Sequence, residues 1–341
     1  MAITLRTEAL NKTYTRKIRK AGLGAALRGL FSSEEEKLSA VSELSFSIER
    51  GERVGLIGEN GAGKSTTLKM LTGILVPTSG KVEVLGLNPW RQRRQLAAQI
   101  GVVFGQRPQL LWDIPVQETL SLLRTMYRIP KEVYDVTYRE AVERLDLGPL
   151  LPVAVRKLSL GQRMRCDLAA SLLHAPAISF LDEPTIGLDV SVKEQVREFI
   201  REMQRRFEST LLLTTHDLKD ITETCDRILL LDRGKLLFDG SLKDFERRFA
   251  TKRRIILELE RPATDSVAAE LANELLALGA ELQECKGHRV VVTYEREGAA
   301  PALTQRLLSR LPVSDIVLEK ADIDSMVASI YRRSTSNVEV A

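Results

Sequence analysis

The sequence is poor in cysteine and histidine, has little net charge, and contains no long apolar run. The cysteines, Cys166, Cys225 and Cys285, show no paired spacing, which argues against a disulfide framework or a zinc site and favours a reducing cytosol. No stretch approaches the roughly 18–20 apolar residues that a membrane-spanning helix needs. The N-terminus has no basic segment followed by an apolar stretch, so it does not resemble a secretory signal.

The net charge is +4 over 341 residues, which is small for a chain of this size. A mixed, solvated surface explains this small positive charge, and we expect no nucleic-acid partner. Hydrophobic residues make up 44% and charged residues 28%, the balance of an ordinary globular protein. The length predicts about two domains.

The most informative stretch is a glycine-rich segment between an apolar strand and a helix. Residues 53–57 predict the strand, and residues 66–71 predict the first turns of the helix. Glycines let backbone N–H groups turn inward around a phosphate, and the helix N-terminus adds a partial positive charge. Lys64 is expected to reach the β- and γ-phosphates, and the Ser65 hydroxyl to hold Mg²⁺. The predicted nucleotide-binding residues of this segment are Gly58, Asn60, Gly61, Ala62, Gly63, Lys64, Ser65 and Thr66.

A basic segment interrupts the first two predicted strands, which are Ile3–Leu10 and Val41–Ile48. This insertion, at about 16–39, begins with Arg16, Lys17, Arg19 and Lys20 and carries leucines near helical spacing. It could lie on an anionic membrane surface or against a partner, or it could be a solvated loop.

Later segments predict more of the sheet and its helices. Buried strands are expected at 100–104, 177–181 and 210–215, and residues 115–150 look helical. Ser159 is a plausible N-cap of the helix that follows it. The strand at 177–181 ends in Asp182 and Glu183, at the edge where open α/β sheets bind ligands. The sequence Asp232-Arg233-Gly234 predicts a hairpin.

Beyond residue 249 the pattern changes to strand, helix, two strands, helix, strand. This is the order of a ferredoxin-like α+β domain, which we expect to span 250–341.

The chain from about 3 to 249, roughly seventy per cent of the sequence, resembles the ATPase subunits of ABC transporters. The most specific match is Leu158-Ser159-Leu160-Gly161-Gln162, which resembles the family signature Leu-Ser-Gly-Gly-Gln. It departs at Leu160, and similar leucine variants occur in the exporter branch of drug-resistance and sodium-extrusion ATPases. The resemblance implies an α/β P-loop NTPase domain of the ABC type at 1–249. That domain would include an antiparallel β subdomain and a helical subdomain at about 107–173.

The resemblance also implies roles for individual residues. Tyr14 matches the aromatic that stacks on adenine, although a packed strand-end tyrosine is the alternative. Gln106 matches the glutamine that touches Mg²⁺ or the lytic water, Asp182 the magnesium carboxylate, and Glu183 the general base. His216 matches the histidine that contacts the γ-phosphate; His174 and His288 are better explained as structural or solvated. Residues Ser159, Leu160, Gly161 and Gln162 would act in trans on the ATP of a second subunit, and Asp189 would lie in the loop that crosses between subunits.

The implied function is an ATP- and Mg²⁺-dependent ATPase that drives separate transmembrane permease subunits, as part of an exporter. A second copy of the chain or a paralogue would complete a head-to-tail dimer, peripheral to the cytoplasmic face of the inner membrane. The alternative is a non-transport ATPase of the same fold, acting as a mechanical or regulatory switch. The sequence contains no long heptad arms and one phosphate loop, which disfavours the chromosome-organising and translation-acting relatives.

Overall fold

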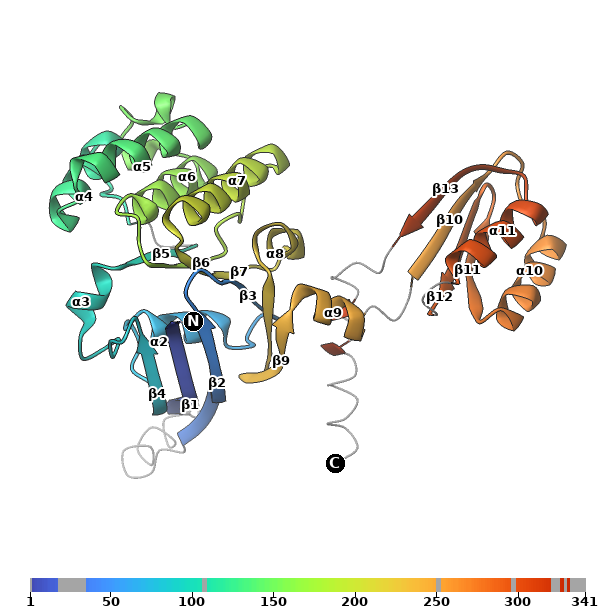
Figure 1. Cartoon of the computed structure of the whole chain (residues 1–341), viewed down its shortest axis with the longest axis horizontal. Helices are drawn as coiled ribbons and strands as arrows, with labels where there is room; N and C mark the ends of the chain where they lie inside the picture. The colour runs from blue at the N-terminus through green and yellow to red at the C-terminus, as the bar shows by residue number, and fades with distance from the viewer. Residues whose placement is uncertain are drawn as a thin grey trace, which may run out of the picture. The chain divides into compact units, whose positions relative to one another are not determined.

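The computed structural model describes residues 2–17, 35–105, 109–249, 253–295, 299–319, 326–327 and 330–331 (Figure 1). Gln106 and most of the basic insertion at 16–39 lie outside these residues. The chain divides into two compact units, Met1–Leu242 and Lys243–Ala341. This division falls slightly before the domain boundary expected at 249.

A six-stranded sheet forms the centre of the first unit. All its neighbouring strands pair in parallel except the last, which turns back on its neighbour through the predicted hairpin. In spatial order the strands are β5 (Ile100–Phe104), β6 (Ile178–Asp182), β7 (Thr210–Thr214), β3 (Arg53–Gly58), β8 (Arg227–Asp232) and β9 (Lys235–Ser241). Strands β6 and β7 are buried at every position, as their continuous apolar sequences predict for a parallel sheet covered on both faces.

A second, antiparallel sheet has the order β2-β1-β4, formed by β2 (Glu35–Glu49), β1 (Ile3–Lys17) and β4 (Ser79–Val84). Its buried face joins the core of the six-stranded sheet through residues such as Leu5, Ile48 and Leu56. Strand β1 extends beyond the predicted end at Leu10, because ladder pairing with β2 continues where the apolar alternation stops. The antiparallel β subdomain is therefore present.

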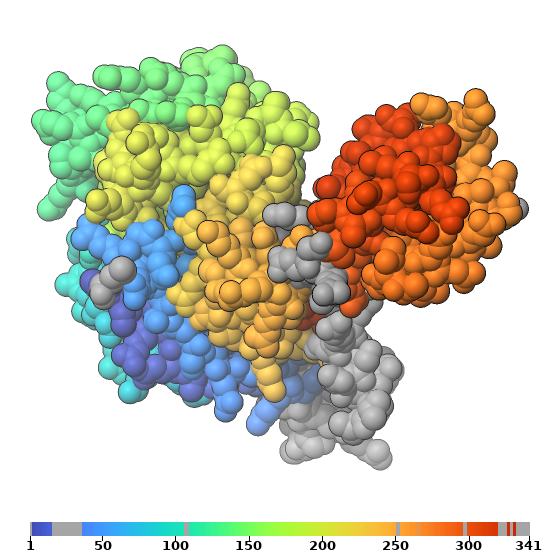
Figure 2. Space-filling view, turned by 45° about the vertical axis from the view of Figure 1, so that its right-hand side comes forward, coloured from blue at the N-terminus to red at the C-terminus, as the bar shows by residue number. Residues whose placement is uncertain are grey.

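The helices of the first unit include a separate layer, α4 to α7, on one side of the six-stranded sheet (Figure 1). In the space-filling view the green helical segment forms a lobe above the blue strands (Figure 2). The helices are α2 (Lys64–Leu71), α3 (Arg93–Ala97), α4 (Val116–Tyr127), α5 (Lys131–Arg144), α6 (Leu160–Leu172), α7 (Val190–Phe207) and α8 (Leu218–Thr224), with short 3₁₀ turns at Gly148–Leu150 and Val155–Lys157. Helix α9 (Leu242–Phe249) begins at the last residue of this unit and otherwise belongs to the second unit.

The region 115–150 is largely helical, as the apolar spacing predicts, but it divides into two helices and a short 3₁₀ turn. Helix α4 ends at Arg128, whose φ of 52° is left-handed, and α5 begins directly after Pro130. Proline disfavours a helical conformation at the residue before it, so Ile129 and Pro130 separate the two helices.

The second unit contains a four-stranded antiparallel sheet in the order β11-β12-β10-β13. Its elements are β10 (Arg253–Leu259), α10 (Asp265–Ala277), β11 (Ala280–Lys286), β12 (Arg289–Tyr294), α11 (Ala300–Arg310) and β13 (Val313–Glu319). Both helices contribute leucines to one core with the sheet, including Leu271, Leu275 and Leu307. The ferredoxin-like fold is confirmed.

In the described parts of both units, the helices are all too short or too polar to cross a membrane.

His174 lies just after α6 and is held neutral by its surroundings. Its ring stacks on Tyr127 at 4.3 Å between centroids, and its Nε2 lies 3.1 Å from the carbonyl oxygen of Ile100. Burial lowers the pKa of His174 to about 4, although the bond to the Ile100 carbonyl acts in the opposite direction. A structural role, as expected from the sequence, fits this environment.

This environment predicts a stability that depends on pH. The pKa of His174 is lower in the folded chain than in the unfolded chain. The contribution of neutral His174 to the free energy of unfolding is therefore fully present above about pH 6.5 and is lost as the pH falls towards 4. One pKa unit corresponds to about 1.4 kcal/mol. The free energy of unfolding of the wild type, relative to His174→Gln, should therefore fall by on the order of 3 kcal/mol over that range. Urea titrations that give parallel pH profiles for both proteins would contradict this explanation.

Candidate active site

The glycine-rich loop joins β3 to α2, the strand and helix that the sequence predicts on either side of it. Gly63 caps the helix with a φ of 102°, and a Cβ at this position would lie only 2.5 Å from the carbonyl oxygen of Ala40. A Cβ on Gly58 would lie 2.8 Å from the carbonyl oxygen of Leu231. Both residues must therefore be glycine for the loop to fit between β2 and β8.

Lys64, the first residue of α2, is 8% exposed. Its Nζ donates hydrogen bonds to the carbonyl oxygens of Gly58, at 2.6 Å, and Glu59, at 3.1 Å. Burial lowers the pKa of Lys64, whereas the nearby carboxylates of Glu183 and Asp182 raise it. The ammonium therefore lies inside the loop, close to the ends of β3 and β6.

Asp182 ends β6 and is almost completely buried. Its Oδ1 accepts hydrogen bonds from the hydroxyl of Ser65, at 3.3 Å, and from the hydroxyl of Thr214 on β7. A serine hydroxyl and a carboxylate side by side are hard oxygen donors, and Mg²⁺ prefers such ligands. The donor set thus fits the metal that the sequence predicts here.

Glu183 and His216 follow the ends of neighbouring strands β6 and β7 and contact each other through Oε2 and Nδ1. Glu183 has a left-handed φ of 57°, which costs a non-glycine residue free energy unless the surroundings hold it. Its N–H donates to the carbonyl oxygen of Thr214 at 2.9 Å. A Cβ on Gly105, at the end of β5, would lie 3.4 Å from the Glu183 Cβ, so the chain before Gln106 passes close by.

Helix α6 begins at the predicted N-cap, Ser159, with a complete capping box. The Ser159 hydroxyl accepts from the N–H of Gln162 at 3.2 Å, and the Gln162 side chain accepts from the N–H of Ser159 at 2.9 Å. Leu160 is 45% exposed and packs against Gly187, where a Cβ would come within 2.9 Å of its Cδ2. The signature residues therefore touch the loop that carries the exposed Asp189.

Tyr14 lies on the exposed part of β1, opposite Leu38 on β2, and is itself 40% exposed. The Nζ of Lys12 lies 5.3 Å from the centre of its ring. Two residues beyond Leu38, Ala40 packs against Gly63 of the loop. Tyr14 is therefore an exposed aromatic on a hairpin that passes beside the phosphate loop.

The fold brings Lys64, Ser65, Asp182, Glu183 and His216 to one edge of the six-stranded sheet. Of the other loop residues predicted for nucleotide binding, Asn60 and Gly61 are exposed, Ala62 is buried, and Thr66 is half-buried.

Four residues behind this edge were not predicted from the sequence and are almost completely buried: Thr185, Arg197, Thr214 and Asp220. The sequence feature that could have revealed this buried cluster is Arg197, which lies beside the apolar stripe of α7. An arginine at such a position needs a buried partner of opposite charge.

The comparisons with known proteins decide the family. Residues 41–186 match the family model described as ABC transporter. The ABC transporter ATP-binding protein NatA of Bacillus subtilis is 30% identical over 62% of this chain and 86% of its own length. The chain belongs to the ABC transporter ATP-binding family. Members of this family are ATPases coupled to transport, as the sequence predicted.

Other similar proteins differ in the direction of transport that their names give. The Nod factor export ATP-binding protein I of Neorhizobium galegae is 36% identical over 59% of this chain and 58% of its own. A methionine import ATP-binding protein of Enterococcus faecalis is 30% identical over 65% of each chain. A dimeric, post-hydrolysis ATP-binding cassette bound to ADP and Pi is similar in structure, with a TM-score of 0.58 and 25% identity over 70% of this chain and 98% of that one.

The position of Lys64 predicts that its removal weakens nucleotide binding itself. A charged hydrogen bond is worth about 1.5–3 kcal/mol, so Lys64→Ala should bind ATP about 10- to 100-fold more weakly by calorimetry. Lys69→Ala is the matched control, because Lys69 is exposed on the same helix. Equal affinities in Lys64→Ala and wild type would exclude a phosphate contact for Lys64.

Proposed function

We propose that this chain is the ATP-hydrolysing subunit of an exporter, and that it drives separate permease subunits from the cytoplasmic face of the inner membrane. The observation that carries the proposal is the convergence of Lys64, Asp182, Glu183 and His216 at one sheet edge. The similarity to a Nod factor export protein and the leucine at position 160 support export, whereas the methionine import relative is the reason for testing the direction.

Hydrolysis of a triphosphate depends mainly on positioning and on neutralising charge. Lys64 and the loop amides bind the phosphates, and Ser65 with Asp182 would hold Mg²⁺, which neutralises charge on the phosphate oxygens. Glu183 takes the proton of the attacking water. His216, in contact with the Glu183 carboxylate through Nδ1, orients that base and presents its other ring nitrogen to the γ-phosphate. Gln106 is proposed to contact the water or Mg²⁺, and Tyr14 to stack on adenine.

A second subunit completes the site in this proposal. The N-terminus of α6, at Ser159 to Gln162, is suited to binding an anion, and we assign it to the ATP of the partner copy. The exposed Leu160 packs against Gly187, two residues before the exposed Asp189, and we assign both to the surface of a head-to-tail dimer. ATP closes this dimer and hydrolysis reopens it, because the γ-phosphate provides the contacts across the interface.

The first prediction for this function concerns Glu183. Glu183→Gln keeps the size of the side chain but removes the base, so ATP should bind normally while turnover falls by about 10²- to 10⁴-fold. The variant should also accumulate as an ATP-bound dimer, measurable by light scattering. Glu83→Gln, an exposed glutamate on β4, is the matched control. Wild-type turnover in folded Glu183→Gln would refute the assigned role.

We further propose that the ferredoxin-like domain regulates the ATPase or stabilises its dimer, although a structural appendage would also fit. A chain that ends after Ala250 should bind ATP as the full-length chain does, since the phosphate loop and its supporting strands lie before that point. A second truncation, after Leu242, locates the boundary more closely because it also removes α9. Loss of ATP binding in a soluble, folded chain that ends at Ala250 would place the boundary elsewhere.

A further inference from the structure

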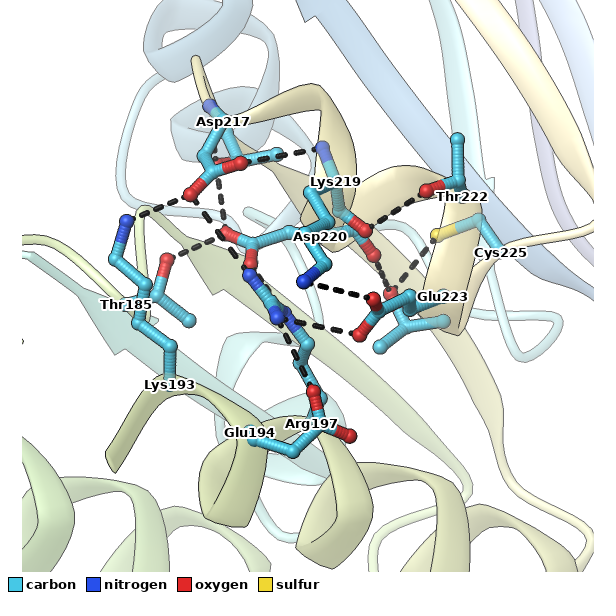
Figure 3. A network of polar contacts seen from close by, with 12 residues as sticks. Thr185, Lys193, Glu194, Arg197, Asp217, Lys219, Asp220, Thr222, Glu223 and Cys225 are labelled. Atoms are coloured by element: carbon cyan, nitrogen blue, oxygen red, sulfur yellow. Dashed lines mark hydrogen bonds and ion pairs between the residues drawn. The ribbon is translucent and has the colours of Figure 1, made fainter. Parts of the chain in front are cut away.

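The carboxylate of Asp220, in the first turn of α8, is 1% exposed and accepts three side-chain hydrogen bonds (Figure 3). Its Oδ1 accepts from the Nε of Arg197 at 2.7 Å. Its Oδ2 accepts from the hydroxyl of Thr215 at 3.0 Å and from the hydroxyl of Thr185. This buried carboxylate is therefore satisfied by one cation and two hydroxyl groups.

The two hydroxyl groups come from the segments that carry Glu183 and His216. Thr185 is two residues after Glu183, and Thr215 is the residue immediately before His216. One carboxylate thus links the chain after β6 to the chain after β7 at their functional ends.

Arg197 supplies the charge that a buried Asp220 requires. It comes from α7, its side chain is 3% exposed, and it also pairs with Glu223 at 3.2 Å and Glu194 at 3.3 Å. Lys193 on the same helix pairs at 2.6 Å with Asp217, the residue after His216. Burial raises the pKa of Asp217, but Lys193, the N–H of Lys219 and Arg197 together hold it below its usual value.

Buried ion pairs add little to stability compared with apolar packing, because the charges must leave water. A network of this kind therefore calls for an explanation other than stability. The left-handed φ of Glu183 provides one, since a strained residue keeps its conformation only when several contacts fix the chain around it.

We infer that Asp220 is a positioning residue, whose bonds to Thr185 and Thr215 keep Glu183 and His216 in contact for hydrolysis. The inference rests on the roles proposed above for Glu183 and His216. Asp220 does not touch substrate in this arrangement; it acts through the two segments that it joins.

The test removes single hydroxyl groups while leaving the buried ion pair intact. Thr185→Val and Thr215→Val are nearly isosteric, and each should lower kcat about 10- to 100-fold, with the Kd for ATP within about twofold of wild type. Thr185→Ser restores the hydroxyl and should recover most of the turnover. Thr222→Val is the matched control, because Thr222 is exposed on α8 and its hydroxyl donates to the carbonyl oxygen of Lys219.

A double variant separates positioning from general destabilisation. Because Thr185 acts through Glu183, Thr185→Val should cause no further loss of kcat in a Glu183→Gln background. A purely structural role would lower the thermal midpoint and ATP binding together and would leave the kcat losses additive, which would overturn the inference.

The outcomes also distinguish this inference from the proposed function. If Glu183→Gln loses turnover while both valine variants match Thr222→Val, the inference is wrong and the proposed function stands. If Glu183→Gln hydrolyses ATP at the wild-type rate, the proposed function fails and the inference fails with it. Each of the two hydroxyl groups makes its own hydrogen bond to Asp220. If one valine variant does not fold, the kcat of the other valine variant and of Thr185→Ser therefore still tests the positioning role.

Discussion

Parallel pairing of β3, β6 and β7 is the constraint on which the site depends. Parallel strands end at the same edge of a sheet, and here Asp182 pairs with Thr214 while Leu56 pairs with the same residue from the other side. This register places the phosphate loop after β3, the two carboxylates at the end of β6, and His216 after β7 within one small region. A shift of one residue in any of the three strands would reverse the faces of its side chains and separate these groups.

The same edge concentrates groups that are costly to bury. Lys64, Asp182, Arg197 and Asp220 are all nearly excluded from water, and each is compensated by carbonyl oxygens, hydroxyl groups or an opposite charge. The apolar strands around them, which are buried on both faces, provide the stability that these charges do not. Under the positioning role inferred for Asp220, these polar groups fix the geometry of Glu183 and His216 rather than add stability.

The sequence predicted those parts of the fold that depend on local patterns. Glycine spacing located the loop, continuous apolar runs located β6 and β7, and the order of elements after residue 249 indicated the ferredoxin-like sheet. The break between α4 and α5 was not predicted, although Pro130 was a signal for it, because proline disfavours a helical conformation at the residue before it. Nor did the sequence predict the link from Asp220 to Thr185, since these residues are 35 positions apart and only the parallel register brings them together.

The claim that two copies share each site is tested most directly by the specific ATPase activity of the purified chain at increasing protein concentration. If the α6 N-terminus of a second copy completes the site, turnover per chain should rise with concentration in the dilute range and level off when dimers predominate. Turnover that is constant per chain from monomeric to dimeric concentrations would contradict the account, because a single copy would then hydrolyse ATP by itself.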